Sequence, residues 1–431
     1  MKYRLPHGAG GRADWEPMTT TPTTEPGAQP DIGHIGPAAA DGAPAAVMGA
    51  SGPGPTTAPP AAAQQRSFLP ALEGMRGLAA LGVLVTHVAF QTGATAIPVL
   101  GRLLERFDMA VAVFFALSGF LLWRPHASAA RGLGNAPTLG YYLRHRVARI
   151  VPAYWIVVCA VLILVPAAAG TAGVQVWLSN LLLLQVFIPL TLTDGLTQMW
   201  SLSVEVAFYL VLPLLAWLLH GLRGRTAAAR VPAVLLLGLV FLGWNFIPVP
   251  TPGGIHADNW LPAYIPWFAG GMLLAELLCD EQRARWRRIL GNQRLMWAIA
   301  GVTFALSATD LGGVAGLTRA EPWQYAAKMG LGTVIGFALL APLVLGPADK
   351  SRRWLTSAPA ATVGRWSYGI FIWHLAVLSV IFPVFGILPF HGDFVKVLVL
   401  TAAFTLPIAA ASHALVEEPC RQWARHFDRR R

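Results

Sequence analysis

Charged residues are scarce in this chain: they make up 12% of its 431 residues, against roughly 25% in soluble proteins. Hydrophobic residues make up 55%, and apolar stretches of about 20 residues, the length of a transmembrane helix, recur from residue 69 to residue 416. The strands of a membrane β-barrel would instead be short and alternating in hydropathy. This composition excludes a soluble protein and predicts an all-α polytopic membrane protein, located in the cell membrane as a multi-pass protein.

Cysteine is also rare. The three present, Cys159, Cys279 and Cys420, are scattered without the spacing of a metal site or a redox pair, so we expect them to be packing residues. The sequence has no glycine-rich phosphate loop, no His-Glu zinc pair and no Gly-x-Ser-x-Gly elbow. We therefore expect no bound metal and no permanently bound cofactor, and a nucleophile of the soluble-hydrolase kind is not indicated.

Acidic residues are fewer than basic ones, which gives a formal net charge of +11. The basic residues gather in short loops between apolar segments instead of forming one patch, which is typical of membrane topology and not of nucleic-acid binding. We therefore expect contacts with membrane lipids and none with nucleic acid.

The hydropathy pattern divides the chain into three parts. Residues 1–66 are rich in Ala, Gly, Pro and Thr without apolar periodicity, which predicts a disordered cytoplasmic tail. Residues 67–420 form the transmembrane domain, and residues 421–431 a basic cytoplasmic tail. We predict about ten transmembrane helices, at roughly 69–91, 107–124, 150–169, 200–220, 231–249, 262–279, 295–310, 327–346, 366–385 and 395–416.

Charge determines how the apolar segment 176–192 is interpreted. With ten spans and both termini in the cytoplasm, the outer loops hold only Arg102, Arg106 and Arg319, and the arginine-rich loops all lie inside. Counting 176–192 as a further span would place most of the basic residues outside, against the positive-inside rule. We therefore expect this segment to be re-entrant or interfacial.

The first predicted helix carries two ionisable residues on one face. Arg76 and His87 are eleven residues apart, almost three whole turns, which is about 16 Å along a helix. Ionisable side chains inside a membrane segment are costly and usually functional, and an imidazole suits proton transfer near neutral pH. Glu73 lies one turn before Arg76 and is a candidate cavity residue. The alternatives are snorkelling for Arg76 and a packing hydrogen bond for His87.

An arginine pair follows in an inner loop. Arg146 and Arg149 are one helical turn apart, and such a pair can bind a phosphate or pyrophosphate through charge-assisted hydrogen bonds. The alternative is a topology determinant or a contact with anionic lipid headgroups.

Further candidates lie in later spans. Glu205 falls about one turn into the membrane from the outer face, in the half where His87 should lie, and a carboxylate could orient that imidazole. The sequence does not show whether they meet. Other candidate cavity residues are Ser118, Tyr368 and His374.

Six motifs in this order resemble the acyltransferase 3 family of integral-membrane O-acyltransferases, over about residues 69–424. They are Leu-Glu-Gly-x-Arg-Gly at 72–77 with a His eleven residues after the Arg, Phe-Phe-x-x-Ser-Gly-Phe at 114–120, Arg-x-x-Arg-Ile-x-Pro-x-Tyr-Trp at 146–155, Trp-Ser-Leu-x-Val-Glu-x-x-Phe-Tyr at 200–209, Ser-Tyr-x-x-Phe-x-x-His at 367–374 and Glu-x-Pro at 417–419.

The resemblance implies transfer of an acyl group, commonly acetyl, from cytoplasmic acyl-CoA as co-substrate to a hydroxyl acceptor. Typical acceptors are sugars of cell-surface polysaccharides and glycolipids, or secondary metabolites such as macrolides. It also implies that Arg76 and His87 match the first-helix pair of the family, Arg146 and Arg149 its cytoplasmic arginine pair, and Glu205 its intramembrane carboxylate.

The chain departs from the family pattern at three positions: Glu73 stands where Asp is frequent, Ala112 where an acidic residue is frequent, and Glu418 where a basic residue is common. We expect no appended hydrolase-like domain, unlike in fused members that modify peptidoglycan, and we expect the chain to act alone or to pass its product to a partner.

The mechanism predicted from the sequence has the CoA phosphates at Arg146 and Arg149. His87, oriented by Glu205, acts as the general base or carries the acyl group briefly, and Arg76 orders the Glu73 side of the cavity. The rival interpretations are a transporter or flippase, whose cavity would also use intramembrane His and Glu, and a scaffold with a degenerate core.

Overall fold

The computed structural model describes residues 69–314, 319–347 and 352–429, and within these ranges the regular structure is helical throughout. Nine helical segments of this part are long and apolar enough to cross a membrane, which confirms a polytopic helical membrane protein. Their principal helices are α2 (Pro70–Gln91), α4 (Ala110–Ala130), α5 (Leu139–Leu164), α8 (Trp200–Leu218), α9 (Arg230–Phe241), α10 (Leu261–Cys279), α13 (Pro322–Leu345), α14 (Ala358–Val384) and α15 (Phe394–Ser412).

Two predicted apolar segments form short helices. The segment 295–310 coincides with α12 (Gln293–Ser307), whose 15 residues extend about 22 Å, less than the roughly 30 Å of a bilayer core. The segment 176–192 overlaps α7 (Val174–Leu181), an eight-residue helix that is followed by a loop. A helix of that length cannot cross a membrane, in agreement with an interfacial or re-entrant segment.

Two tails were predicted on either side of the transmembrane domain. The tail predicted at residues 1–66 lies outside the described residues. Residues 421–429, predicted as part of a basic cytoplasmic tail, lie in helix α16 (Glu418–Arg429). This helix packs against α5, where Asp428 pairs with Arg144 and lies 2.5 Å from Nε2 of His145.

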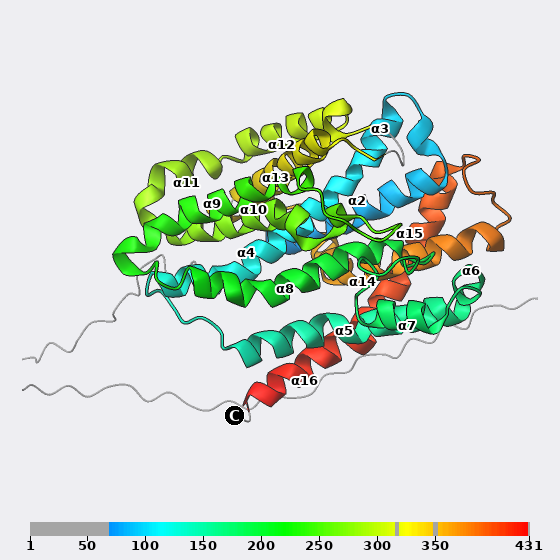
Figure 1. Ribbon diagram of the computed structural model, residues 1–431, viewed down its shortest axis with the longest axis horizontal. Helices are drawn as coiled ribbons and strands as arrows, with labels where there is room; N and C mark the ends of the chain where they lie inside the picture. Colours follow the sequence, from blue (N-terminus) through cyan, green and yellow to red (C-terminus); the bar gives the residue numbers. More distant parts are fainter. Residues whose placement is uncertain (1–68, 315–318, 348–351, 430–431) are drawn as a thin grey trace, which may run out of the picture. The chain divides into compact units, whose positions relative to one another are not determined.

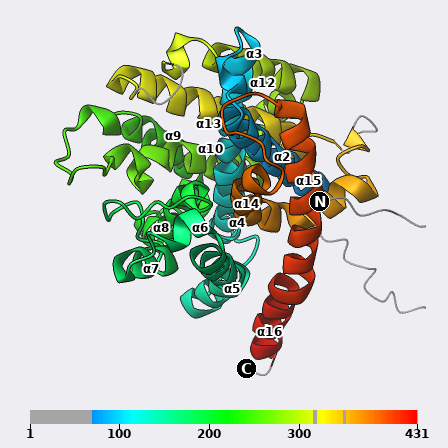
Figure 2. The same cartoon turned by 90° about the vertical axis from the view of Figure 1, so that its right-hand side faces the viewer.

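The helices are arranged around two packed groups (Figures 1 and 2). In one group α4, α10 and α13 contact one another, with α9 and α12 outside them; in the other, α14 packs against α15. Helix α2 packs against α4 on one side and α14 on the other. Figure 2 shows α2, α4, α10 and α14 in the middle of the bundle, with α12 above and α5 and α16 below. Helix α2 therefore connects the two groups. Its proline is at the first position, Pro70, and it has none in its interior.

Glycine allows the central helices to approach closely. A β-carbon at Gly119 of α4 would overlap the Phe268 carbonyl oxygen of α10, and one at Gly271 of α10 would overlap the Ala116 carbonyl of α4. At the contact of α2 with α14, a β-carbon at Gly77 would lie 2.9 Å from the backbone nitrogen of Gly364. Small residues at such crossings are typical of helix packing in membranes.

A buried ionic cluster joins α4, α9 and α10. Glu276 is completely buried, and its carboxylate accepts hydrogen bonds from Arg131 (2.5 Å), Arg230 (2.8 Å) and the indole of Trp123 (2.7 Å). Its two oxygens are thus paired with two guanidinium groups and an indole. A buried charge persists in an apolar interior when it is paired and hydrogen-bonded in this way.

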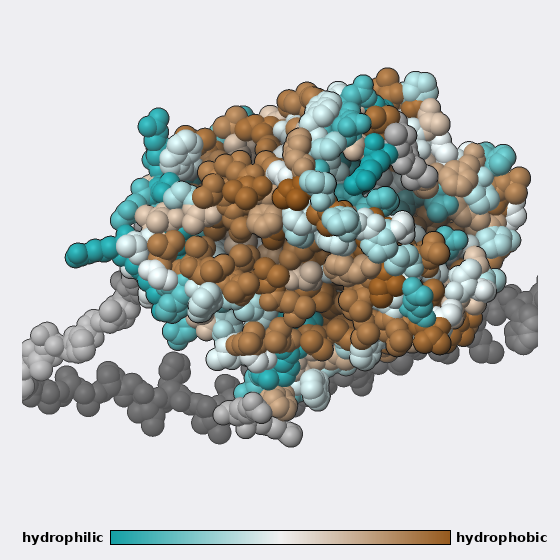
Figure 3. Space-filling model, in the orientation of Figure 1, coloured by the Kyte–Doolittle hydropathy of each residue, from teal (hydrophilic) through white to brown (hydrophobic). Residues whose placement is uncertain are grey.

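The outer surface of the bundle suits lipid. In Figure 3, hydrophobic residues cover the middle of the visible face, and hydrophilic residues gather toward the left-hand end and at the upper right. On α8, for example, Leu210 and Trp217 are 66% and 70% exposed. Exposure of such large apolar side chains is stable in a bilayer, where lipid tails cover them.

We expect Gly271→Ala to destabilise the protein and Gly301→Ala to leave it unchanged or slightly stabilised. The added methyl group collides with α4 at position 271, whereas at position 301 nothing lies within 4 Å of an ideal β-carbon. Overpacking costs about 1–3 kcal/mol, and replacing an interior helix glycine by alanine gains up to about 1 kcal/mol. Thermal unfolding in detergent measures both effects. Equal behaviour of the two variants would contradict the close crossing.

Candidate active site

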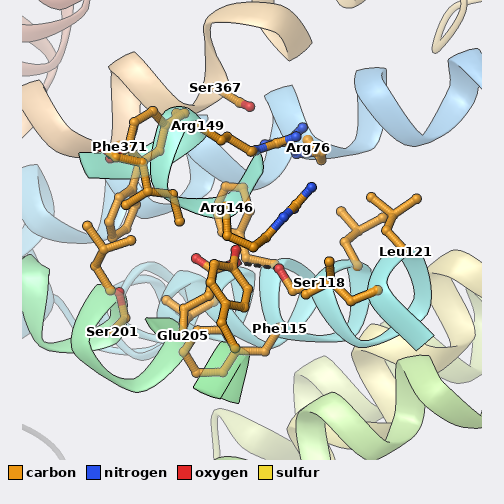
Figure 4. A pocket seen from close by; sticks show the side chains of 18 residues that line it. Arg76, Phe115, Ser118, Leu121, Arg146, Arg149, Ser201, Glu205, Ser367 and Phe371 are labelled. Carbon is orange, nitrogen blue, oxygen red and sulfur yellow. Dashed lines mark hydrogen bonds between the residues drawn. The ribbon is translucent and has the colours of Figure 1, made fainter. Parts of the chain in front are cut away.

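A cavity opens between α2, α4, α5, α8 and α14, and Figure 4 shows the side chains around it. Arginine, carboxylate, hydroxyl and aromatic groups share its wall. The lining residues are Arg76, Val111, Phe114, Phe115, Leu117, Ser118, Leu121, Leu122, Arg146, Arg149, Ile150, Ser201, Leu202, Glu205, Tyr209, Ser367, Tyr368 and Phe371. Of the site residues predicted from the sequence, the structure brings six into this cavity: Arg76, Arg146, Arg149, Glu205, Ser118 and Tyr368.

Three arginines line one side of the cavity. Arg76 comes from α2, and Arg146 and Arg149 come from successive turns of α5; Figure 4 shows their side chains directed into the same region. The guanidinium carbon of Arg146 lies 5.9 Å from the centre of the Tyr209 ring. Among the residues that the structure describes, no carboxylate lies within salt-bridge distance of these arginines. They differ in this from Arg131 and Arg230, which both pair with Glu276.

Glu205 is the acidic residue in the cavity lining. Its Oε1 accepts a hydrogen bond from the hydroxyl of Ser118 on α4 and another, of 2.7 Å, from the hydroxyl of Tyr209. Tyr209 lies four residues after Glu205, so both side chains project from one face of α8. These bonds hold a carboxylate within an apolar bundle, opposite the three arginines.

His87 has different partners from those predicted. Its Nδ1 lies 2.8 Å from the carbonyl oxygen of Val83 and 3.3 Å from Nε2 of His374. The prediction that Glu205 orients His87 is therefore wrong for this structure: Glu205 bonds to Ser118 and Tyr209, and the ring beside His87 is that of His374. His87 and Glu205 lie on separate helices, α2 and α8, and the sequence gave no information on how each helix is rotated about its axis.

The two histidines lie next to the cavity wall and not in its lining. The backbone carbonyl of Phe371 is 2.8 Å from Nδ1 of His374, while Phe371 itself lines the cavity. The Phe371 ring also contacts Phe114, another lining residue, at 6.0 Å between centroids. Phe371 thus connects the wall of the cavity with the histidine pair.

The remaining candidates are distributed as follows. Tyr368 lines the cavity, and its hydroxyl donates a 2.8 Å hydrogen bond to the Ile150 carbonyl of α5. Glu73 and His374 lie outside the lining. Within the described residues, no three His, Cys, Asp or Glu side chains gather closely enough to hold a metal ion.

Several lining residues were not selected from the sequence. Tyr209 and Ser201 belong to the same helix and motif as Glu205, and the spacing of four residues was a usable signal for Tyr209. Phe114 and Phe371 stand in two of the six motifs. They were not predicted as cavity residues, because an aromatic residue in a spanning helix can face lipid, another helix or a cavity with the same sequence pattern.

Residues 69–412 match the acyltransferase domain family. The chain belongs to this family. The matched range covers every residue of the cavity and both histidines, so the site lies wholly within the family's domain.

Curated relatives of this family member come from several bacteria. Acyltransferase MdmB of Streptomyces mycarofaciens is 29% identical, over 72% of this chain and 79% of the relative. The peptidoglycan O-acetyltransferase OatA of Listeria monocytogenes is 22% identical over 83% of this chain, and the putative peptidoglycan O-acetyltransferase YrhL of Bacillus subtilis is 24% identical over 85%. The chain spans little more than half the length of the last two, 56% and 57%. No solved structure gives a significant match.

We expect Glu205→Gln to lower acyltransferase activity at least tenfold, or about 1.4 kcal/mol in barrier height. The amide oxygen can still accept bonds from Ser118 and Tyr209, but the negative charge facing the arginines is lost. Thermal unfolding should change little. Glu418→Gln, which removes a partly exposed carboxylate at the start of α16, is the control. Equal activity of the two variants would show that the charge of Glu205 is dispensable.

Proposed function

We propose that this family member transfers an acetyl group from acyl-CoA to a hydroxyl of a cell-surface carbohydrate or glycolipid. Support for the donor comes from the three cavity arginines, which have no carboxylate partner in the described part of the chain. Clustered cations of this kind favour a polyanionic ligand, and arginine binds phosphate oxygens in a bidentate manner. The phosphates of acyl-CoA meet that requirement.

The separation of the two parts of the site suits such a donor. Arg76 and His87 lie on the same unbroken helix, about 16 Å apart along its axis. A molecule that binds through phosphates at one end and reacts at the other must have a long, flexible arm between them. Acyl-CoA has this form, with its thioester at the end of the pantetheine arm.

In the proposed reaction, His87 removes the proton from the acceptor hydroxyl as the oxygen attacks the thioester carbonyl. The carbon–sulfur bond then breaks and CoA leaves as its thiol. Arg76, Arg146 and Arg149 hold the phosphates, and Glu205 limits the repulsion among these cations through its opposite charge. The positive-inside rule, applied to the arginine-rich loops, supports a cytoplasmic position for the phosphate end.

The acceptor class is supported by the relatives. Two of them are named as peptidoglycan O-acetyltransferases, one of these putatively, and peptidoglycan contains sugar hydroxyls. Identity is higher to the acyltransferase MdmB, whose name specifies no carbohydrate. That difference favours a secondary metabolite, such as a macrolide, as the second candidate acceptor.

We expect His87→Ala to lower the rate by about 10²–10⁴-fold, the usual contribution of a general base. The protein is assayed in nanodiscs by release of CoA from labelled acetyl-CoA, with and without cell-envelope extract, and with a macrolide in a parallel reaction. Release that requires the extract supports a carbohydrate or glycolipid acceptor, and release that requires the macrolide supports the second candidate. Activity of His87→Ala equal to that of wild type would contradict the mechanism.

The double variant Arg146→Gln, Arg149→Gln should raise the KM for acetyl-CoA by about 100-fold or more, because each charge-assisted hydrogen bond contributes roughly 1.5–3 kcal/mol. The double variant Arg225→Gln, Arg285→Gln removes the same charge from exposed positions outside the cavity and is the control. A transporter would show the opposite pattern: transport of its substrate with no release of CoA. If the two double variants raise KM equally, the cavity arginines do not bind the donor specifically and contribute only through the overall positive charge of the protein.

A further inference from the structure

Helix α14 places a second histidine against the proposed base. The ring centroids of His87 and His374 are 5.0 Å apart, and Nε2 of His374 lies 3.3 Å from Nδ1 of His87. His374 is completely buried, whereas His87 is partly exposed. Water therefore does not replace the contact from the side of His374, and His87 remains accessible to a substrate.

Backbone carbonyls determine where the protons lie on both rings. Nδ1 of His374 is 2.8 Å from the Phe371 oxygen and 3.1 Å from the Ile370 oxygen, and Nδ1 of His87 is 2.8 Å from the Val83 oxygen. A carbonyl oxygen only accepts hydrogen bonds, so each Nδ1 carries a hydrogen and donates it. In the neutral rings both Nε2 atoms then have a free lone pair.

This assignment gives the contact between the rings a direction. The Nδ1–H of His87 is shared between the Val83 carbonyl and Nε2 of His374, which accepts. The Nε2 of His87 faces neither of these groups and is left unprotonated. It is therefore the atom of His87 that can take a proton from a hydroxyl.

We propose that His374 is the positioning residue of the site: its Nε2 accepts a hydrogen bond from Nδ1–H of His87 and so orients the Nε2 of His87 as the base. The proposal rests on the proposed function of the site. His374 has the role that the sequence suggested for Glu205, since it supplies the acceptor that fixes the tautomer and the ring orientation. A neutral, buried imidazole replaces the carboxylate usual in this position.

The proton balance is consistent with this role. Nε2 of His87 takes the hydroxyl proton while the hydroxyl oxygen bonds to the thioester carbon and the carbon–sulfur bond breaks. The His87 ring is then an imidazolium, and its Nδ1–H faces the lone pair of His374, which stabilises the positive charge. Transfer of the proton from Nε2 of His87 to the departing thiolate gives the free thiol and restores the neutral ring.

Three substitutions at residue 374 separate positioning from packing. His374→Gln can place an amide oxygen where Nε2 was, and so keeps an acceptor for His87. His374→Asn reaches only the position of Nδ1, and His374→Phe fills the volume of the ring without any acceptor. The three variants are compared in nanodiscs with labelled acetyl-CoA and the acceptor preparation that supports turnover by the wild type.

We expect kcat to fall about 10- to 100-fold in His374→Asn and His374→Phe, the loss seen when groups that orient metal-bound histidines are removed. His374→Gln should retain most activity, and the KM for acetyl-CoA should not change in any of them, because the cavity arginines are untouched. In a His87→Ala background, His374→Phe should cause no further loss, since His374 acts only through His87. Equal loss in the Gln and Phe variants, or additive loss in the double variant, would overturn the proposal.

A second measurement does not depend on turnover. In nitrogen-15 histidine spectra of the full chain, assigned by comparison with His87→Ala, we expect Nδ1 of His87 to be protonated and Nε2 unprotonated, with a shift of the Nδ1 signal in His374→Phe. The opposite tautomer, or an unchanged Nδ1 signal, would overturn the proposal. If the spectra are as expected but the protein never releases CoA, the hydrogen bond between the two histidines is supported and the proposed acyl-CoA-dependent function is refuted.

Discussion

The close contact of α2 with α14 determines where the candidate catalytic side chains of this protein lie. Backbone reaches backbone at Gly77 and Gly364, and two turns or more farther along the same two helices His87 and His374 lie side by side. Because α2 also packs against α4, the same helix presents Arg76 to the cavity that Ser118 of α4 lines. A larger residue at either glycine would therefore disturb the cavity and the histidine pair together.

Two ways of holding charge in an apolar bundle appear in one chain. The buried carboxylate of Glu276 forms salt bridges with Arg131 and Arg230, and this cluster holds the helices together. In the cavity, Arg76, Arg146 and Arg149 face Glu205 without a salt bridge, and Glu205 itself is bound to hydroxyl groups. A cavity left with excess positive charge is an expensive arrangement in a membrane protein unless an anion enters it. Pairing therefore distinguishes the structural arginines from those of the site.

The sequence was sufficient for the helical membrane class, for most spans and for the grouping of Arg76, Arg146, Arg149, Ser118 and Tyr368, because hydropathy and motif order carry that information. It could not supply the pairing of His87, since contact between helices depends on rotations and crossings that no local pattern records. Glu205 was predicted as the partner of His87 from its depth in the membrane, and His374 was predicted only as a cavity residue. Nor did the sequence predict that α12 is a short helix packed against α13, or that α16 packs against α5.

The unbroken course of α2 has a consequence for selectivity. The only proline of this helix is at its first position, so the helix has no interior hinge. The distance between Arg76 and His87 along the helix is therefore fixed. A donor with a shorter arm would reach the arginines or the imidazole, but not both at once. In the proposed reaction, the length of the donor, and not only its charge, would then decide which thioester can react.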